Sequence, residues 1–408
     1  MRIAVVADDL TGALDTGAQF RTWGLSVEVA PTPDKLGGLK GSADVIVVNT
    51  DSRGDKPEIA YRKVIEATEA LTGLCDVFYK KVDSTLRGNV GAELDAIMES
   101  TGQTAAVVAP AYPPNGRVTR GGHVYVNGVP LHETEYAAEV AHTSSYIPEI
   151  IGAQTRRRST HVSLADVRHG PAHLSERFMN EVKKGSRAVV IDAETERDLL
   201  AAAGLPVKVF CGSAGLAAEL PEGLGLRAPW PTLTVCGSTR SSSRAQVSSL
   251  INRLGVMQIN LDTVRLLGGG DAVGEALKGA EAALAVGESI VLVSAPDPEG
   301  VEETRRLGER LGLKDAEAEA RIVDALAEVT VKLLEGHQIS GIVLTGGATA
   351  LAVCKGLGAE SMEITGEVQP GVPVVTLPNG VRAVTKAGGF GSGDALIEAV
   401  KYLKRMRS

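Results

Sequence analysis

Ala7-Asp8-Asp9-Leu10-Thr11-Gly12-Ala13 is the stretch that decides the fold. The run before it, Ile3–Ala7, is short, apolar and partly β-branched, which predicts a buried strand. The residues after it predict a helix that begins near Thr11. Ligands of open parallel sheets bind outside the carboxyl ends of the strands. Two adjacent carboxylates at such an end therefore predict a binding site at the first strand of the fold.

Segments typical of strands and of helices alternate through the first half of the chain. The apolar runs that predict further strands are residues 27–30, 44–49, 76–81, 105–109, 188–192 and 207–211. The amphipathic segments that predict helices between them are residues 56–71, 87–100 and 195–203. This alternation is typical of βαβ units, so it predicts an α/β fold with a mostly parallel sheet flanked by helices.

A Pro- and Gly-rich segment, residues 221–231, interrupts this pattern and predicts a linker. A second α/β pattern follows, with expected strands at residues 233–235, 290–294, 341–344 and 374–377 and expected helices at 243–253 and 394–405. We therefore expect two domains, residues 1–225 and residues 226–408, each with a mostly parallel sheet flanked by helices.

Composition excludes several classes of protein. The net charge of −8 argues against nucleic acid as a partner, because phosphate backbones attract clustered Lys and Arg. Membrane binding is not expected, because no run approaches the roughly 18 apolar residues of a membrane span. The cysteines lie far apart without metal-ligand spacing, which favours reduced thiols. The opening apolar run is too short for a targeting segment, and we expect a cytoplasmic protein.

Charged clusters follow three of the expected strands in the first domain. Because the carboxyl ends of parallel strands share one edge, these clusters predict a crevice for a small, polar, anionic substrate. Arg and Lys would bind a carboxylate there, and Asp would bind hydroxyl groups. A helix cap or a surface ion pair is the alternative for any single residue. The residues concerned are Asp8, Asp9, Asp51, Arg53, Lys81, Asp83, Ser84 and Arg87.

Residues 112–129 are rich in Pro, Gly and Asn and predict a binding loop outside the sheet. Arg120 and His123 are its candidate substrate-binding residues. His123 would serve as a base or as a hydrogen-bond donor to the substrate. A structural histidine is the equally weighted alternative.

Three Gly-rich turns between expected strands and helices distinguish the second domain. Glycine lets the backbone approach a ligand closely, and helix N-termini attract phosphate. Neither the Walker A pattern nor the dinucleotide GxGxxG pattern is present, so the turns together predict a nucleotide site of another type. The candidate cofactor-binding residues are Ser238, Arg240, Gly346, Gly347, Ala348, Thr349, Gly388, Gly389 and Gly391.

A crevice for a small polar molecule in one domain and phosphate-binding turns in the other together predict phosphoryl transfer across a cleft between the domains. Such chemistry needs positioning, Mg²⁺ to spread phosphate charge, and a carboxylate to accept the hydroxyl proton. Asp8 or Asp9 is the first choice for that carboxylate and Asp83 the second. ATP and Mg²⁺ are the expected cofactors, and the metal ligands are not assigned.

The sequence resembles the four-carbon acid-sugar kinase family from end to end. The matching motifs are ADDLTGA at 7–13, KKVDSTLRGN at 80–89, APAYPPNGR…GG.VYVNG.PLHETE at 109–135, GS at 237–238, LTGG.TA at 344–350 and K.GGFG at 386–391. The resemblance implies an ATP-dependent kinase that phosphorylates the terminal hydroxyl of a tetronate such as D-threonate, D-erythronate or 3-oxo-tetronate. It also implies an N-terminal acid-sugar domain and a C-terminal ATP domain.

By this resemblance the sugar acid would contact Asp8, Asp9, Lys81, Asp83, Ser84 and Arg87. ATP would contact Ser238, the turn 346–349 and the loop 388–391. Relatives commonly have an acidic residue after the paired glycines, where this chain has Ala348. Relatives often have small residues where this chain has Thr239 and Arg240, so Arg240 would bind phosphate or form a salt bridge.

Two other functions stay open at this point. In a ribokinase-like sugar or glycerate kinase, Asp394 of the segment Gly391-Ser392-Gly393-Asp394 would be the base. In a sensor, the chain would bind a sugar acid and a nucleotide without turnover. The particular acid and the oligomeric state also stay open, with a homodimer as one arrangement.

Overall fold

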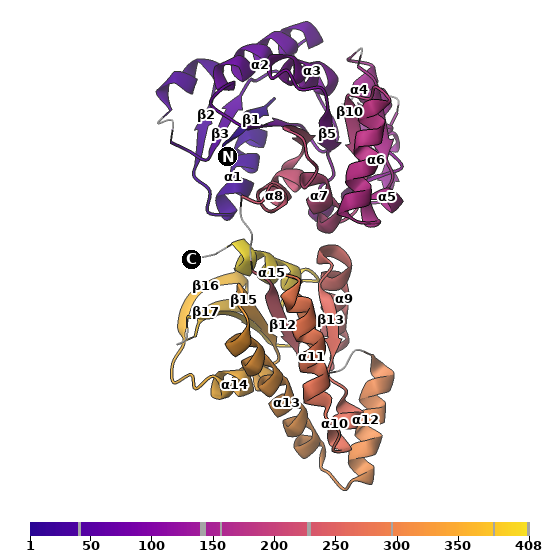
Figure 1. Ribbon diagram of the computed structural model, residues 1–408, viewed down its shortest axis with the longest axis vertical. Helices are drawn as coiled ribbons and strands as arrows, with labels where there is room; N and C mark the ends of the chain where they lie inside the picture. The colour runs from indigo at the N-terminus through magenta and orange to yellow at the C-terminus, as the bar shows by residue number, and fades with distance from the viewer. Residues whose placement is uncertain are drawn as a thin grey trace. The chain divides into compact units, whose positions relative to one another are not determined.

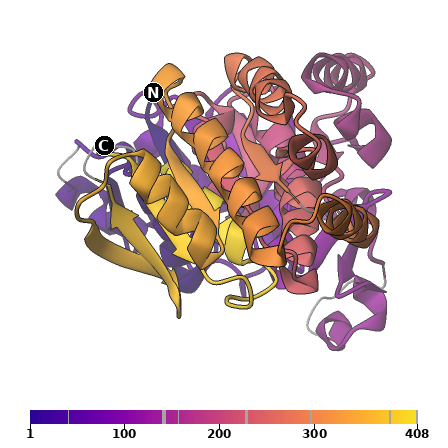
Figure 2. The same cartoon turned by 90° about the horizontal axis from the view of Figure 1, so that it is seen from below.

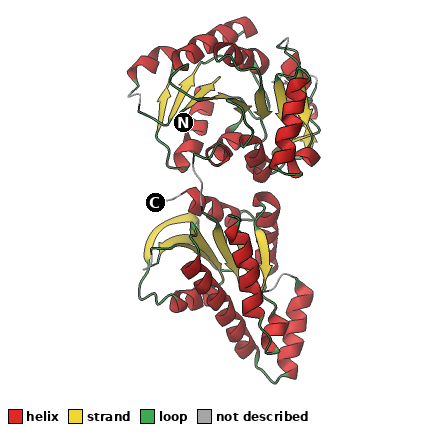
Figure 3. Cartoon of the chain, viewed as in Figure 1, coloured by secondary structure: helices red, strands yellow, loops and turns green. Residues whose placement is uncertain are grey.

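The computed structural model describes residues 1–39, 42–138, 144–155, 157–226, 230–294, 297–377 and 380–405. It divides the chain into a first unit, Met1–Ala228, and a second unit, Pro229–Ser408 (Figure 1). Each unit has its own sheet with helices on both sides (Figure 3). None of the helices in the described ranges combines the length and the apolar character that crossing a membrane requires.

The first unit contains an eight-stranded sheet in which all neighbouring strands are parallel. Its order is β2-β3-β1-β4-β11-β5-β10-β9. The strands are β1 (Ile3–Ala7), β2 (Val27–Ala30), β3 (Val45–Asn49), β4 (Val77–Lys81), β5 (Ala106–Ala109), β9 (Ser159–Val162), β10 (Ala188–Ile191) and β11 (Val209–Gly212).

Helices cover both faces of this sheet because its central strands are apolar on both sides. Val5 packs into the core beneath α1, α7 and α8, and its neighbour Val6 packs into the core beneath α2, α3 and α4. The helices are α1 (Leu10–Thr22), α2 (Pro57–Leu71), α3 (Val90–Ser100), α4 (Ile147–Gly152), α5 (Leu164–Arg168), α6 (Pro171–Lys183), α7 (Glu196–Ala203) and α8 (Ala214–Gly223). The 3₁₀ turns are η1 (Pro33–Gly38), η2 (Pro113–Asn115), η3 (Leu131–Glu133) and η4 (Glu135–Ala138).

The segment predicted to be an irregular binding loop forms a small antiparallel sheet instead. Its strands are β6 (Arg117–Arg120), β7 (His123–Val126) and β8 (Val129–Pro130). Apolar alternation in β7 explains the difference, because Val124 and Val126 enter the core of the first unit. Asp192, directly after β10, holds the β6–β7 turn by accepting hydrogen bonds from the amides of Gly121 and Gly122 at 2.7 and 2.8 Å.

The second unit contains a seven-stranded sheet of order β13-β14-β12-β15-β18-β17-β16. The pairs from β13 to β18 are parallel, and β17 is antiparallel to both of its neighbours. The strands are β12 (Thr232–Cys236), β13 (Met257–Asn260), β14 (Ile290–Val293), β15 (Gly341–Thr345), β16 (Glu363–Gln369), β17 (Val372–Thr376) and β18 (Arg382–Lys386). This sheet is therefore mostly parallel, with one antiparallel edge.

Helices also lie on both faces of the second sheet. Figure 2 shows several of them, in orange, lying across it. The helices are α9 (Ser241–Leu254), α10 (Thr263–Leu267), α11 (Ala272–Ala285), α12 (Pro298–Arg310), α13 (Asp315–Gly336), α14 (Gly347–Gly356) and α15 (Ala395–Arg405). One core lies beneath α11, α13 and α14, and the other beneath α9 and α15.

The predicted α/β fold class with two mostly parallel sheets is confirmed. The predicted linker, residues 221–231, is partly wrong, because Pro221 lies inside α8 and stays buried there. Residues 227–229 of that linker lie outside the described residues. Besides β6, β7 and β8, four further strands were not predicted, namely β9, β13, β16 and β18.

Candidate active site

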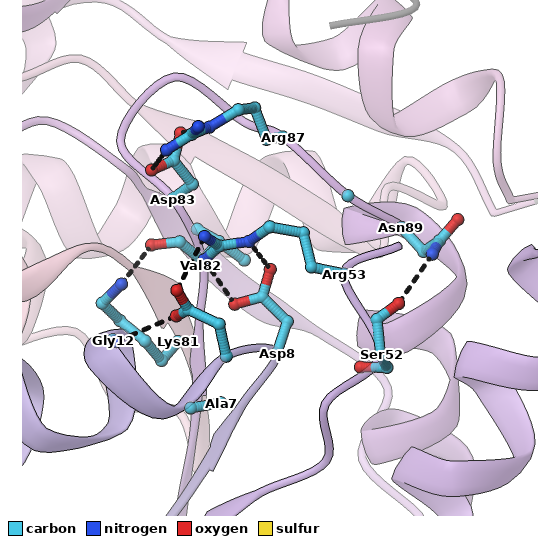
Figure 4. Close-up of polar contacts among 12 residues, drawn as sticks. Ala7, Asp8, Gly12, Ser52, Arg53, Lys81, Val82, Asp83, Arg87 and Asn89 are labelled. Atoms are coloured by element: carbon cyan, nitrogen blue, oxygen red, sulfur yellow. Dashed lines mark hydrogen bonds and ion pairs between the residues drawn. The ribbon is translucent and has the colours of Figure 1, made fainter. Parts of the chain in front are cut away.

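The carboxyl ends of three neighbouring strands carry the predicted charged clusters of the first unit. Parallel register pairs Ala7 at the end of β1 with Asn49 of β3 and with Lys81 of β4. The residues that follow each strand therefore meet at one edge of the sheet, as the sequence predicts. Figure 4 shows the resulting cluster of charged side chains.

Arg53 joins the two adjacent aspartates of the first strand end. Its Nε and Nη2 donate to Oδ2 and Oδ1 of Asp8 at 2.8 and 2.9 Å. Its Nη1 donates to Oδ2 of Asp9 at 2.8 Å. The contact with Asp8 is a bidentate, charge-assisted pair, which fixes both side chains strongly. Arg53 thus holds the carboxylates in place with three of its five N–H donors.

The two aspartates differ in their access to solvent. Asp8 is 1% exposed, whereas the Asp9 side chain is 30% exposed. Burial by itself raises the pKa of Asp8, but Lys80, Arg53 and Lys81 together hold that pKa below its ordinary value. Asp9 is the N-cap of α1, where Oδ1 accepts a hydrogen bond from the Gly12 amide at 2.9 Å. Asp9 is therefore the member of the pair that a ligand can reach.

A fully buried ion pair supports the cluster from within the sheet. Lys80 Nζ lies 2.9 Å from Oε2 of Glu93 on α3 and donates to the Lys81 carbonyl at 2.8 Å. Burial lowers the pKa of Lys80, but Glu93 and Asp8 outweigh it and raise the pKa overall. Ser52 donates a hydrogen bond to Glu93, so this pair also fixes the loop that carries Arg53. Lys80 therefore contributes positive charge beside Asp8 without reaching solvent.

Lys81 occupies the space beside Gly12 at the start of α1. Its Nζ donates to the Val82 carbonyl at 2.8 Å, and the residue is 5% exposed. A Cβ on Gly12 would lie 2.9 Å from this Nζ and 2.4 Å from Oδ1 of Asp9, which explains the glycine. Burial lowers the pKa of Lys81, and the carboxylates of Asp8 and Asp9 oppose this only in part.

Asp83 forms a second carboxylate–guanidinium pair on the loop after β4. Arg87 donates to its two oxygens from Nε and Nη2, both at 3.0 Å. The Thr85 amide adds a hydrogen bond at 3.0 Å, and the Thr85 hydroxyl adds another. Burial raises the pKa of Asp83, but these bonds outweigh it and lower the pKa to about 2. Ser84 lies half-buried on the same loop.

We expect Asp83 to stabilise the fold above pH 4 and to lose this effect as the pH falls toward 2. Its pKa is about 2 in the folded chain against an ordinary value of 3.8, so the folded state favours the charged form. The difference corresponds to about 2 kcal/mol of unfolding free energy. Denaturant unfolding between pH 2 and 5 measures this contribution to the unfolding free energy. As the pH falls from 5 to 2, the unfolding free energy of Asp83→Asn should decrease less steeply than that of the wild type. Equal slopes of unfolding free energy against pH for the two proteins would contradict the assignment.

The loop after β4 packs directly on the Asp8–Arg53 pair. A Cβ on Gly88, whose φ is +93°, would lie 3.2 Å from both Oδ2 of Asp8 and Cγ of Arg53. Asn89 donates to the Ser52 carbonyl at 3.2 Å and thereby ties this loop to the one that carries Arg53. The structure thus brings Asp8, Asp9, Arg53 and Lys81 together, with the loop of Asp83, Ser84 and Arg87 beside them.

The structure places three other predicted residues elsewhere. Asp51 is exposed, with a φ of +47°, and its backbone contacts Asn49 and Lys63. Arg120 forms an ion pair with Glu194 after β10, and His123 shares a hydrogen bond with Ser145 at 2.9 Å. β10 lies three strands from β4, roughly 14 Å along the sheet. The ion pair of Arg120 therefore lies away from the aspartate cluster, and the contacts described for Asp51 and His123 involve none of Asp8, Asp9, Arg53 and Lys81.

A cavity of about 610 Å³ in the second unit brings together most of the predicted cofactor-binding residues. The predicted residues that line it are Ser238, Arg240, Gly346, Gly347, Ala348, Thr349 and Gly388. The turn before α9, the turn before α14 and the loop after β18 supply them, as the three Gly-rich turns predict. Gly389 and Gly391 do not line the cavity.

Close backbone approach explains the glycines of these turns. A Cβ on Gly388 would lie 2.6 Å from the Ser238 hydroxyl, and one on Gly389 would lie 3.0 Å from Nη1 of Arg240. Ser243, in the first turn of α9, donates to the Gly388 carbonyl at 2.9 Å, and its Oγ lies 3.0 Å from the hydroxyl oxygen of Ser238. The turn after β12 and the loop after β18 are therefore held together at the mouth of one cavity.

Helices α10, α12 and α13 supply the part of the cavity wall that sequence reasoning missed. The polar residues in question are Thr263, Thr304, Arg305, Asp315 and Glu319. They belong to amphipathic helices without a glycine motif, so no local signal distinguishes them. Within the described ranges, no group of three or more His, Cys, Asp or Glu side chains could hold a metal ion. Asp315 and Glu319 are the carboxylates that line the cavity.

Two family models match the chain, one in each unit. Residues 3–220 match a sugar-binding N-terminal domain, and residues 233–396 match a nucleotide-binding C-terminal domain. D-threonate kinase of Salmonella typhimurium is 35% identical over 100% of this chain and 99% of its own length. The chain belongs to the four-carbon acid-sugar kinase family.

Other relatives in this kinase family act on different four-carbon acids. D-erythronate kinase of Heliobacterium modesticaldum is 31% identical over 98% of this chain and 97% of its own length. A 3-oxo-tetronate kinase of Methylobacterium radiotolerans is 30% identical over 97% of each chain. A solved structure from Bordetella bronchiseptica, a domain-swapped dimer with bound citrate, superposes with a TM-score of 0.65. It is 31% identical and covers 100% of each chain, so the two proteins share one fold over the whole length.

Proposed function

We propose that the chain is an ATP-dependent kinase that phosphorylates the terminal hydroxyl of a four-carbon sugar acid. The observation that carries the proposal is the Asp8–Arg53–Asp9 cluster at the sheet edge of the unit that matches the sugar-binding domain. Relatives named as tetronate kinases match the chain over nearly its full length and support the same chemistry.

The sugar acid is assigned to the carboxyl ends of β1, β3 and β4. Carboxylates of Asp9 and Asp83 accept hydrogen bonds from hydroxyl groups, while Lys81 and Arg87 supply positive charge for the substrate carboxylate. The solved relative from Bordetella bronchiseptica was found with citrate, itself a carboxylic acid with a hydroxyl group. Asp9 is our choice for the group that accepts the hydroxyl proton, because Asp8 is buried behind Arg53.

The nucleotide is assigned to the 610 Å³ cavity of the second unit. This volume lies within the range of about 300–1,000 Å³ that is usual for small-molecule sites. Mg²⁺, when bound with ATP, would spread the charge of the phosphates. A magnesium ion in kinases commonly uses one or two protein carboxylates together with substrate phosphates and water. Asp315 and Glu319 fit this requirement, because they are the acidic residues of the cavity wall.

An ADP-release assay with ATP and Mg²⁺ tests the proposal. The substrate panel is D-threonate, L-threonate, D-erythronate, L-erythronate, 3-oxo-tetronates and D-glycerate. We expect turnover with one or a few four-carbon acids, and none without an acid. ATP binding without turnover on any acid would favour the sensor alternative. Turnover confined to D-glycerate would show a three-carbon substrate instead.

Asp394→Asn is expected to retain near-normal turnover. In the structure Asp394 Oδ2 lies 2.7 Å from Nη1 of Arg253, in the last turn of α9. The glycine loop instead contacts Ser243 and Gln246 in the first two turns of α9, and these residues lie about 15 and 10 Å from Arg253 along the helix axis. Asp394 is therefore assigned to an ion pair rather than to proton transfer. A loss of kcat beyond about a hundredfold would restore the ribokinase-like alternative with Asp394 as base.

A homodimer and a cytoplasmic location are further parts of the proposal. The solved relative from Bordetella bronchiseptica is a domain-swapped dimer in two crystal forms, which supports a dimer for this chain. All four cysteines are free thiols, which supports a reducing compartment. Light scattering of the purified chain measures the oligomeric state directly.

A further inference from the structure

Three side chains form a row at the carboxyl ends of the central strands of the second unit. The register pairs Cys236 of β12 with Thr345 of β15, and Thr345 with Lys386 of β18. Cys236 belongs to the core beneath α9 and α15, as does Val384, two residues before Lys386. Side chains alternate along a strand, so Lys386 points to that same face of the sheet.

Lys386 is buried without a partner for its charge. The residue is 4% exposed, and Nζ has no hydrogen-bond partner among the described residues. The hydroxyl of Thr345 beside it is also buried, and the described part of the chain offers it no hydrogen-bond partner. Lys80 of the first unit shows the contrast, because Glu93 lies 2.9 Å from its Nζ. A buried ammonium is unfavourable unless an anion or several acceptors meet it. Burial accordingly lowers the pKa of Lys386.

The start of α9 provides a second, independent feature that favours an anion at this place. This helix has 14 residues, no side-chain cap at Arg240 and no acidic residue in its first turn. Its first amides are directed toward the turn after β12, and the helix dipole favours negative charge there. Ser243 in this first turn binds the carbonyl of Gly388, two residues after Lys386. The uncapped helix start and the tip of β18 are thus held side by side.

We propose that Lys386 binds the phosphate chain of the nucleotide at the start of α9. The cavity assigned to the nucleotide includes Ser238 and Gly388 from this region. The Lys386 carbonyl also accepts a hydrogen bond from the Gly346 amide at 3.0 Å, so β18 fixes the turn before α14 as well. The nucleoside then lies toward α12 and α13, and the phosphates lie toward α9. This inference rests on the proposed nucleotide site and adds the residue that neutralises phosphate charge there.

Lys386→Met tests the assignment, because methionine fills a similar volume without charge. Calorimetric titration compares ATP with adenosine, which lacks phosphates. We expect the Kd for ATP to rise at least about tenfold and the Kd for adenosine to stay unchanged. The thermal midpoint should stay the same or rise, because an unpaired buried charge is removed. Lys278→Met, at an exposed lysine on α11, is the matched control and should leave both Kd values unchanged.

Each outcome of the titration has a distinct meaning. Equal ATP affinity in the wild type and in Lys386→Met would overturn the inference and leave the kinase proposal intact. Equal weakening of ATP and adenosine would also overturn it, because the residue would then support the fold of the cavity. Failure of the wild type to bind ATP would overturn the proposed nucleotide site and the inference with it. The ADP-release assay distinguishes this last case from the others, because a wild type that releases ADP must bind ATP.

An acyl-phosphate derivative of ATP tests the same position without any substitution. The amine of a lysine beside the phosphates attacks the acyl carbon and forms an amide. The carbon–oxygen bond to the γ-phosphate breaks, ATP leaves with the electron pair, and the amine proton passes to solvent. We expect mass spectrometry to find the label on Lys386 and excess ATP to suppress it. ATP-protected labelling confined to other lysines would overturn the inference, even if the methionine variant failed to fold.

Discussion

Asp9→Asn is expected to lower kcat by about 10²–10⁴-fold, which is the usual contribution of a positioned general base. The Asp9 carboxylate is the part of the aspartate pair that reaches solvent, and Arg53 holds one of its oxygens. Asparagine retains the N-cap of α1, because both residues cap helices about equally well. The unfolding free energy should therefore change by less than about 1 kcal/mol. Steady-state kinetics with the acid identified in the substrate panel measures kcat and KM.

Asp15→Asn is the matched control, because Asp15 is exposed on the same helix. It removes the same charge and should leave kcat unchanged. A wild-type kcat in Asp9→Asn would contradict the assignment and move the proton-accepting role to Asp83. A change confined to KM would show that Asp9 binds the sugar acid without taking its proton.

Arg53→Met is expected to destabilise the first unit by about 3 kcal/mol and to abolish measurable turnover. Removing the guanidinium leaves the buried Asp8 carboxylate without its bidentate partner, and losing one member of a buried pair commonly costs about 3–5 kcal/mol. Lys80 and Lys81 still favour the charged form of Asp8, so we expect a loss of unfolding free energy near the lower end of that range. Turnover is lost because Asp9 also loses the group that orients it.

Tryptophan fluorescence can report on the first unit by itself. Trp23 is buried there, with its indole N–H donating to the Ala218 carbonyl at 2.8 Å. In a Trp230→Phe background, denaturant unfolding followed by fluorescence reports on Trp23. Arg62→Met, at an exposed arginine on α2, is the control and should unfold like the parent. Unchanged stability of Arg53→Met would show that Asp8 finds other partners.

Apolar runs made most of the fold predictable. Every strand of the first sheet except β9 was predicted. β1, β3, β5 and β10 are buried on both faces and contain few polar residues, whereas β2 is half-buried but still mostly apolar. The missed strands lack that pattern. β16 reads Glu363–Gln369 with mostly exposed or half-exposed residues at a sheet edge, and β13 is largely exposed at the opposite edge. Pairing with neighbouring strands, which no local pattern encodes, determines such edge strands.

More of the first site than of the second could be predicted from the sequence. Asp8, Asp9 and Lys81 follow buried strands directly, and parallel pairing alone brings them together. The role of Arg53 as their link depends on the path of its loop, which the sequence does not show. Glu93 was missed because it is one of three acidic residues on α3, and only the packing of this helix against the sheet brings it to Lys80. The wall formed by α12 and α13 was missed for the same reason, since helix packing places it.

The position of β11 has a consequence for how the first unit assembles. This strand is the last of the unit in sequence, yet it lies between β4 and β5 near the middle of the sheet. During synthesis the earlier strands can pair only as two separate partial sheets, each with an unpaired edge. Those two edges, at β4 and β5, stay available for pairing with other chains until residues 209–212 emerge. Completion of the eight-stranded sheet is therefore a late event in biogenesis, and the long sequence separation between β4 and β11 favours slow closure.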